Sequence, residues 1–192
     1  MLDSTALPRA LRLLGDVLQE RGFSYELVAA GGSALLLLGL LERPTRDLDV
    51  VALVEGRRYV AANPLPPELL NAVRDVGGTL GVGDDWLNPG PASLLELGLP
   101  EGFAERVETR RFGGLTLHLA SRSDQICFKV YAATDQGPDS KHFDDLNALA
   151  PTKNELIEAA RWARTHDPSE GFRGELIALL RVMGMADAAQ VV

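Results

Sequence analysis

The chain has 192 residues, of which 46% are hydrophobic, and its formal net charge at pH 7 is −8. This length allows one domain, or one domain with a small appendage, and the hydrophobic fraction is ordinary for a protein that buries a proper core. The acidic balance argues against non-specific binding to nucleic acid. The single cysteine, Cys127, excludes an internal disulfide and is typical of a reducing compartment.

A secretory or membrane-spanning segment is not expected. Acidic residues interrupt the N-terminal stretch at Asp3, Asp16 and Glu20, unlike in a signal peptide. The apolar run over 27–41 is too short, and too interrupted by glycine, to span a bilayer. We therefore expect a cytoplasmic protein without a membrane partner.

The first third of the chain predicts two helices and two strands. Residues 5–21 should form an amphipathic helix, with leucines on one stripe at positions 7, 11, 14 and 18. Residues 23–30 should form the first strand. The wholly apolar segment over 33–41 predicts a buried helix, which Pro44 ends. Residues 47–54 are apolar on both faces beyond two aspartates, which is typical of a central strand.

Two aspartates lie at the start of that second strand. Because side chains alternate across a strand, Asp47 and Asp49 should point to one face, opposite Leu48 and Val50. Neighbouring carboxylates repel each other in a partly dry site unless a cation neutralises them. Mg²⁺ (or Mn²⁺) can do so, and Mg²⁺ commonly takes one or two carboxylates together with substrate phosphates and waters. The pair is therefore a candidate metal site.

A glycine turn precedes the apolar helix. Gly31 and Gly32 would let the backbone approach a ligand closely, and Ser33 is a natural N-cap. The free N–H groups and the dipole at a helix start favour an anion such as phosphate. The turn is therefore a candidate phosphate seat.

The middle of the chain predicts loops around one short helix. Residues 55–66 should be a loop, and a helix should run over 67–76 with Pro67 at its start. Residues 77–91 are rich in glycine and contain Trp86, which either lines a pocket or anchors a long loop by packing.

The rest of the chain predicts a hairpin and then helices only. Segments 104–111 and 115–120, joined by two glycines, should pair as a β-hairpin. Four helices are expected. They run over 123–134, from just after the turn at 137–140 to about 149, over 152–165 and over 171–185. Ser123 should cap the first of them, and Thr152 with Glu155 should form a capping box. The predicted fold is α+β, with a mixed-sheet core over 1–122 and a helical half over 123–192 packed on it as a single compact unit.

Lys129 is the only cation in a strongly apolar helical stretch, and a buried lysine needs a partner. Two readings are open. Lys129 forms a structural ion pair with Asp144 or Asp145, or it binds a phosphate group of a ligand. We favour the second reading.

The two candidate features together resemble a known signature. Gly31-Gly32-Ser33-Ala34 is followed by Thr45-Arg46-Asp47-Leu48-Asp49-Val50, with thirteen residues between the serine and the first aspartate. This arrangement resembles the nucleotidyltransferase-fold superfamily, and most of all its bacterial branch of abortive-infection-type toxins and uncharacterised relatives. The resemblance covers most of residues 25–160, although only these two motifs are specific. It implies a nucleotidyltransferase-like sheet core.

The resemblance also implies a reaction. A nucleoside monophosphate would move from a nucleoside triphosphate, such as ATP, to an acceptor hydroxyl on RNA, protein or a small molecule. The setting would be defence or toxin–antitoxin, with an antitoxin-type protein as a candidate partner. Asp47 and Asp49 would be catalytic and would hold the metal, the glycine turn with Ser33 would seat the β- and γ-phosphates, and Lys129 would offset the triphosphate charge. Asn88 and Lys141 are further candidates, because relatives carry a similar Trp-Leu-Asn loop and a similar Lys-x-x-Asp-Asp-Leu segment.

One departure from the family pattern keeps alternatives open. Active nucleotidyltransferases usually carry a third carboxylate on a strand next to the Asp-x-Asp strand, whereas the second hairpin strand here has Thr116 and His118. His118 is then a metal ligand, a base or a structural residue, and Glu108 is a weaker substitute. The main rival is a binding or regulatory module that keeps the fold without the chemistry. Two others are a transferase for a small-molecule hydroxyl with a closed pocket, and a structural unit whose aspartates pair with Arg43 or Arg46.

Overall fold

The computed structural model describes residues 1–190 and 192. The chain divides into two compact units, Met1–Ser121 and Arg122–Val192, one residue before the boundary expected from the sequence. The first unit holds a mixed β-sheet with helices, and the second is helical. The α+β class with a helical C-terminal half is therefore confirmed.

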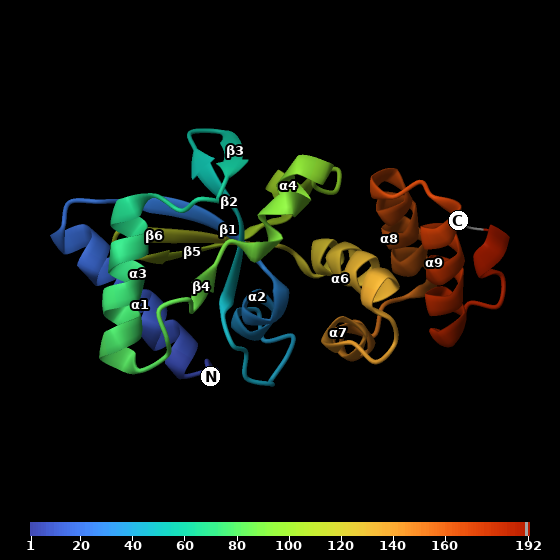
Figure 1. The fold of residues 1–192 in the computed structure, drawn as a ribbon, viewed down its shortest axis with the longest axis horizontal. Coiled ribbons are helices and arrows are strands. Elements are labelled where there is room, and N and C mark those ends of the chain that lie inside the picture. Colours follow the sequence, from blue (N-terminus) through green and yellow to red (C-terminus); the bar gives the residue numbers. More distant parts are fainter. Residues whose placement is uncertain (191) are drawn as a thin grey trace. The chain divides into compact units, whose positions relative to one another are not determined.

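The sheet of the first unit runs in the order β3-β2-β1-β6-β5, with β4 beside β2 (Figure 1). β1 is antiparallel to β2 and parallel to β6, and β2 is antiparallel to β3 and parallel to the short β4. The strand bounds are β1 Tyr25–Ala30, β2 Leu48–Glu55, β3 Arg58–Ala61, β4 Leu87–Asn88, β5 Glu108–Phe112 and β6 Leu115–Leu119. Because β1 occupies one edge of β2, β3 and β4 share its other edge, and β2 is an interior strand as predicted.

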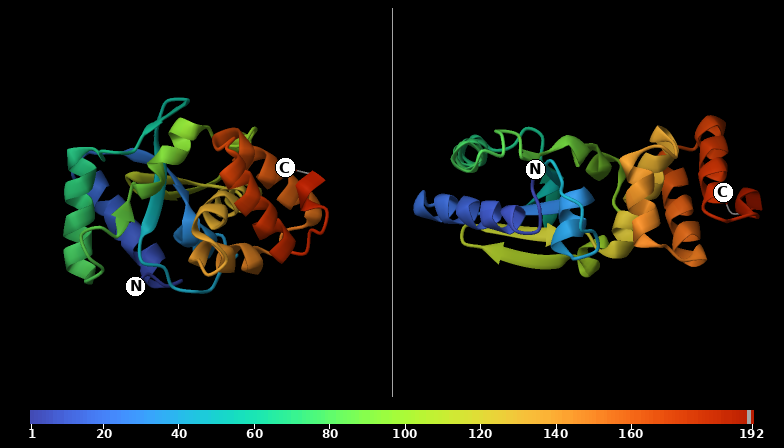
Figure 2. Two further views of the ribbon diagram at one scale, coloured as in Figure 1. Left: turned by 45° about the vertical axis from the view of Figure 1, so that its right-hand side comes forward. Right: turned by 90° about the horizontal axis from the view of Figure 1, so that it is seen from below.

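The helices of the first unit bury the residues that the sequence pattern selected. The predicted leucine stripe of α1 is fully buried at positions 7, 11, 14 and 18. Figure 2 shows α1 lying along β5 and β6, and a Cβ at Gly15 would overlap the Phe112 carbonyl group, so glycine permits this close approach. The helix bounds are α1 Ala6–Glu20, α2 Gly31–Leu37, α3 Pro67–Leu80, η1 Gly90–Ala92, α4 Ser93–Leu97 and α5 Phe103–Arg106.

Three segments of the first unit differ from prediction. One is 77–91, expected to be a loop, which contains the end of α3 at Leu80 and the strand β4. The expected loop over 55–66 contains β3, because Gly56 at φ +64° allows a two-residue turn that pairs Glu55 with Arg58. The expected strand over 104–111 begins only at Glu108, because α5 precedes it. Phe103 starts that helix, is buried, and packs edge-on against Tyr59 at a centroid distance of 5.8 Å. The tertiary contact therefore overrides the alternating pattern of the sequence.

In the second unit, α6 packs against the other three long helices. The predicted capping box is confirmed, with the Thr152 backbone N–H donating to Glu155 Oε2 at 2.8 Å and the Glu155 N–H donating to Thr152 Oγ1 at 3.3 Å. Ser123 lies inside α6 and is not its N-cap, contrary to prediction. The bounds are α6 Arg122–Gln136, α7 Lys141–Leu149, α8 Lys153–His166, α9 Glu170–Val182 and η2 Ala188–Gln190. No helix in the described part of the chain is both long and apolar enough to cross a bilayer.

The capping box makes the stability of the second unit depend on pH. Partial burial raises the pKa of Glu155, but hydrogen bonds from Thr152 and Arg122 outweigh it and leave that pKa below its ordinary value. The contribution of Glu155 is therefore complete above the unfolded-state pKa and is lost as the pH falls through the lowered folded-state pKa. We expect Glu155→Gln to reduce the free energy of unfolding by about 1 kcal/mol near pH 7. Urea unfolding from pH 7 to pH 3 should show the wild type approaching the variant on the acid side, and a constant gap would contradict the assignment.

Candidate active site

The predicted site residues of the first unit converge where β1 ends and β2 begins. In the sheet register, Asp49 of β2 pairs with Ala30 of β1 on one side and with Asn88 of β4 on the other. The β1–β2 pairing shifts between Val28 and Ala29, which leaves one extra residue in β2 close to Asp49. Such bulges redirect neighbouring side chains and are frequent beside functional sites. Asp47 lies just before β2, and both aspartates, which we call the carboxylate centre, are partly buried.

The loop that leads into the carboxylate centre is fixed by two buried hydroxyl groups. Ser33 is fully buried, and its Oγ donates to the backbone carbonyl of Asp47. Thr45 Oγ1 donates to the same carbonyl at 3.2 Å. Ser33 is therefore not the N-cap that the sequence predicted, because α2 already begins at Gly31 with Ala30 at the cap position. The role of Ser33 in this structure is to tie α2 to the entrance of β2.

The two glycines that were expected to form a turn before the helix are the first residues of α2, and they lie between a carboxylate and a guanidinium group. We keep the name glycine turn for these two residues. Gly31 has φ +72°, and a Cβ there would overlap Asp49 Oδ2. A Cβ on Gly32 would lie 3.5 Å from Arg43 Nη2 and 3.4 Å from Thr45 Oγ1. The absence of a side chain at Gly31 lets Asp49 approach the backbone, whereas the distances at Gly32 are ordinary van der Waals contacts that place Arg43 and Thr45 beside it.

Asn88 joins the carboxylate centre from β4. Its Nδ2 donates to Asp47 Oδ2 at 3.3 Å, and its Oδ1 accepts from the Gly90 N–H at 2.9 Å. Trp86, two residues earlier, is fully buried, and its Nε1 donates to the Val73 carbonyl at 2.9 Å. Trp86 is therefore the packing anchor of the two alternatives, and it holds the strand that presents Asn88.

His118 takes part in a different set of contacts. It lies on β6, with β1 between that strand and β2. Its Nε2 is 2.9 Å from Glu26 Oε2, and its Nδ1 is 3.0 Å from Thr109 Oγ1. Both ring nitrogens thus have protein partners, which is the arrangement of a structural histidine. Glu108, the weaker substitute, forms a salt bridge with Arg110 at 2.7 Å.

The two candidate lysines belong to the second unit. The Lys129 ammonium lies 2.8 Å from Asp145 Oδ2, and the two side chains are only 5% and 1% exposed. His142 Nδ1 is 3.5 Å from the same ammonium. Lys141 is exposed at the start of α7. The structural partner that the sequence offered for Lys129 is therefore present, and it is Asp145 and not Asp144.

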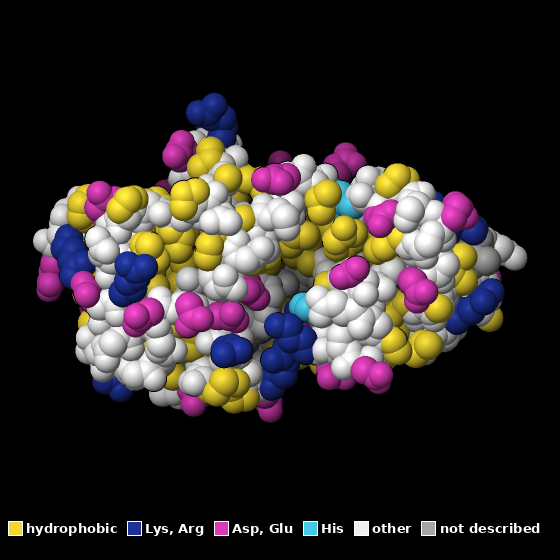
Figure 3. Space-filling model, viewed as in Figure 1, with side chains coloured by type: hydrophobic (Ala, Val, Ile, Leu, Met, Phe, Trp, Pro, Cys, Tyr) yellow, Lys and Arg dark blue, Asp and Glu magenta, His cyan; other side chains and the backbone are white. Residues whose placement is uncertain are grey.

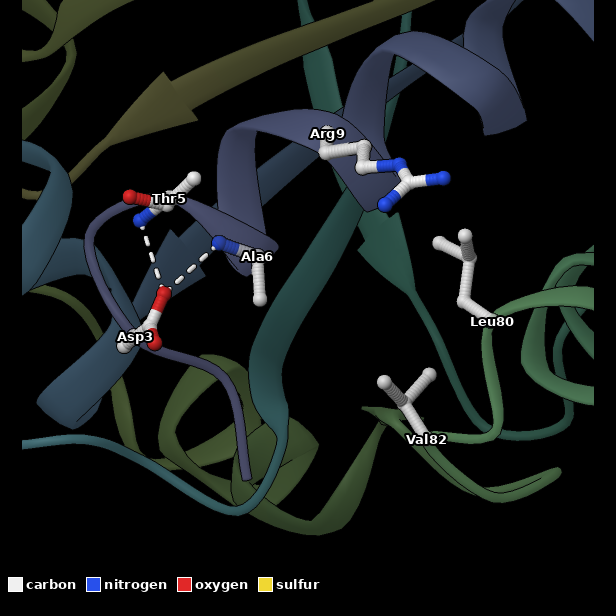
Figure 4. Close-up of a pocket in the computed structure, with 6 residues that line it drawn as sticks. All are labelled: Asp3, Thr5, Ala6, Arg9, Leu80 and Val82. Atoms are coloured by element: carbon white, nitrogen blue, oxygen red, sulfur yellow. Dashed lines mark hydrogen bonds between the residues drawn. The ribbon is translucent and has the colours of Figure 1, made fainter.

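The N-terminal residues are hydrogen-bonded to the loop that precedes the carboxylate centre. Leu2 is fully buried and exchanges two backbone hydrogen bonds with Thr45, at 2.7 and 2.9 Å. Asp3 follows, and its Oδ1 accepts from the Thr5 and Ala6 N–H groups at 2.8 Å each (Figure 4), which holds the Asp3 pKa below its ordinary value. Figure 4 also shows Arg9, Leu80 and Val82 around the same small cavity of about 200 Å³. This cavity contains none of the predicted site residues.

The donor set at the carboxylate centre fits a hard divalent cation. Two carboxylates with room for water and phosphate oxygens are the usual protein contribution to Mg²⁺ or Mn²⁺. Within residues 1–190 and 192, no group of three or more His, Cys, Asp or Glu side chains is arranged to hold a metal ion. Asp47 and Asp49 are the residues that could hold such an ion, and Asn88 lies beside Asp47.

Comparison of the chain with protein-family models, with curated proteins and with solved structures found no match. Sequence reasoning treated Arg43 only as a structural partner of the aspartates and gave Thr45 no site role. Both lie a few residues before the Asp-x-Asp motif. Their position in the short loop that leads into the second strand is the signal that could have identified them.

The contact between Gly31 and Asp49 can be tested directly. We expect Gly31→Ala to cost about 1–2 kcal/mol of backbone strain and also to displace the Asp49 carboxylate. Gly39→Ala is a matched control, because Gly39 has a nearly identical φ of +71° and a methyl group there would meet nothing within 4 Å. Thermal unfolding of both variants would measure the loss of stability, and Mg²⁺ titration would measure the effect of the displaced carboxylate on metal affinity. Equal effects of the two substitutions on metal affinity would contradict the close approach.

Proposed function

We propose that this protein is a metal-dependent nucleotidyltransferase, which moves a nucleoside monophosphate from a nucleoside triphosphate to an acceptor hydroxyl. The observation that carries the proposal is the glycine turn of Gly31 and Gly32, which Asp49 approaches at one glycine and Arg43 at the other. A triphosphate with its cation can be bound by carboxylates that hold the cation and by an arginine that contacts the phosphate oxygens.

Each residue has a defined task in this proposal. Arg43 would bind phosphate oxygens at the turn, because its planar guanidinium group can bind two of them at once. Asp47 and Asp49 would hold Mg²⁺ or Mn²⁺, which would neutralise charge on the triphosphate. Ser33 and Thr45 would keep the Asp47 backbone in place. A role for Lys129 in phosphate binding stays a prediction beside its ion pair with Asp145.

The reaction balances as a single displacement. The acceptor oxygen forms a bond to the α-phosphorus, and the bond from that phosphorus to the oxygen that bridges it to the β-phosphorus breaks. Pyrophosphate leaves with the electron pair of the broken bond, and the hydroxyl proton passes to water. The protein residues hold the reacting groups in line and offset charge, which is most of what catalysis of phosphoryl transfer requires.

A second candidate function is a nucleotide-binding or regulatory module without catalysis. The observation that favours it is the amide of Asn88 beside Asp47, on a strand next to β2, where the family pattern has a third carboxylate. His118 does not fill that place, because β1 separates its strand from β2. Both candidates bind nucleotide through the same residues. They differ in whether label from an α-labelled triphosphate reaches any acceptor.

The decisive experiment is a calorimetric titration of the whole protein with each nucleoside triphosphate, with and without Mg²⁺. We expect Mg²⁺-dependent binding, which Arg43→Ala weakens about tenfold because a charge-assisted hydrogen bond is lost. Arg46→Ala is the matched control, since it removes the same charge from the same loop, and it should bind like the wild type. Failure of the wild type to bind any triphosphate would overturn both candidates.

A further inference from the structure

An open groove of about 410 Å³ lies on the β4 side of the first unit. The residues that define its chemistry are Asn63, Leu65, Arg74, Asp84, Asp85 and Asn88. They come from the segment before α3, from α3 and from the loop that leads into and out of β4. On the face drawn in Figure 3, hydrophobic side chains gather between α3 and β4, with charged side chains along the border. The volume is within the range of small-molecule sites, but the groove is open, whereas a transferase for a small-molecule hydroxyl was expected to have a closed pocket.

The groove adjoins the carboxylate centre through Asn88. This residue lines the groove and also donates to Asp47 Oδ2 at 3.3 Å. In the sheet register, Asn88 and Ala30 flank Asp49 on opposite sides, and Ala30 leads directly into the glycine turn. The strand that lines the groove and the strand that leads into the glycine turn therefore lie on opposite sides of Asp49.

This arrangement suits an in-line displacement at phosphorus. The attacking hydroxyl and the departing pyrophosphate must lie on opposite sides of the α-phosphorus. If the β- and γ-phosphates lie at the turn beside Arg43, the acceptor must approach from the side of Asn88. That side is where the groove is.

We propose that the groove binds the acceptor, and that the acceptor is a small hydroxyl compound with a positively charged amine. The proposal rests on the nucleotidyl transfer inferred above. Asp84 and Asp85 are exposed in the groove against the single guanidinium group of Arg74, so the groove attracts cations more than anions. The same carboxylates repel the phosphates of RNA. Leu65 and Leu87, both largely buried, supply an apolar floor for the carbon skeleton of the acceptor.

The test uses the full chain, α-labelled ATP, Mg²⁺ and acceptors that differ only in charge. Chitosan disaccharide carries two amines, and its N,N′-diacetyl form keeps its hydroxyl groups without positive charge. A short RNA with a free 3′ hydroxyl is the anionic acceptor. We expect label on the cationic disaccharide with kcat/KM at least about tenfold above that of the acetylated form, and no label on RNA.

Variants of the groove separate this proposal from the nucleotide site. Asp84→Asn/Asp85→Asn should raise the KM for the cationic disaccharide about tenfold and leave ATP affinity unchanged. Asp16→Asn/Glu20→Gln removes the same charge from exposed positions on α1 and should change neither quantity. Equal transfer to the acetylated form, label on RNA, an unchanged KM, or no labelled acceptor while ATP still binds would each overturn the acceptor class. Loss of ATP binding by the wild type would instead overturn nucleotidyl transfer itself.

Discussion

Replacement of Asp49 by asparagine should reduce nucleotidyl transfer by at least about 100-fold and abolish Mg²⁺-dependent binding of the triphosphate. Asparagine keeps the size of the side chain, so the fit against Gly31 is preserved while the negative charge is lost. The remaining carboxylate of Asp47 cannot by itself supply the charge of a two-carboxylate metal site. The fold should persist, because Asp49 is only partly buried.

The measurement is calorimetric titration with ATP and Mg²⁺, followed by transfer of label under the same conditions. Asp47→Asn should behave in the same way, and the double variant should be no worse than either single one, because the two residues act as one unit. Asp16→Asn removes one charge from the exposed face of α1 and should leave both readouts unchanged. Full Mg²⁺-dependent binding by the Asp49 variant would show that the carboxylate centre is not the metal site.

The second large effect concerns stability and lies in the other unit. Replacement of Lys129 by methionine should cost about 3–5 kcal/mol, because it leaves the carboxylate of Asp145 buried without its cation. The two side chains are 5% and 1% exposed and lie 2.8 Å apart, so solvent cannot replace the lost partner. Asp145→Leu should lower the free energy of unfolding by a similar amount, since it leaves the ammonium group of Lys129 buried without its carboxylate. The double variant Lys129→Met/Asp145→Leu should recover most of the loss, because two apolar residues of similar volume replace the pair.

Urea unfolding of the four proteins provides this double-mutant cycle, followed by circular dichroism so that unfolding of the helical unit is recorded. A small cost for Lys129→Met alone would contradict a buried pair. The stable double variant also separates the two readings of Lys129. If its ATP affinity equals that of the wild type, Lys129 is structural, and if its affinity falls with the fold intact, Lys129 binds phosphate.

Periodicity and local chemistry were enough to predict much of the architecture. The leucine stripe of α1, the interior position of β2, the capping box at Thr152 and the helical C-terminal half are all confirmed. These features are repeated over several residues or are satisfied within one turn of chain, so neighbours along the sequence determine them. The glycine turn and the Asp-x-Asp motif were visible for the same reason.

Features that depend on contacts between distant segments were not predictable. Serine is a typical N-cap residue, yet the hydroxyl of Ser33 donates to the carbonyl of Asp47. These two groups come together only because α2 packs against β2. Asn88 reaches Asp47 because the buried ring of Trp86 fixes a two-residue strand that no pattern of alternation could reveal. Arg43 approaches Gly32 for a similar reason, since its loop is clamped to Leu2 through Thr45. The sequence by itself thus determined the long helices, the interior strand and the two motifs, because short-range chemistry specifies them, whereas the short helices α4 and α5 were not predicted. Which polar side chains surround the carboxylates was decided by the tertiary structure, because those partners lie far apart in the chain and meet only in the folded sheet.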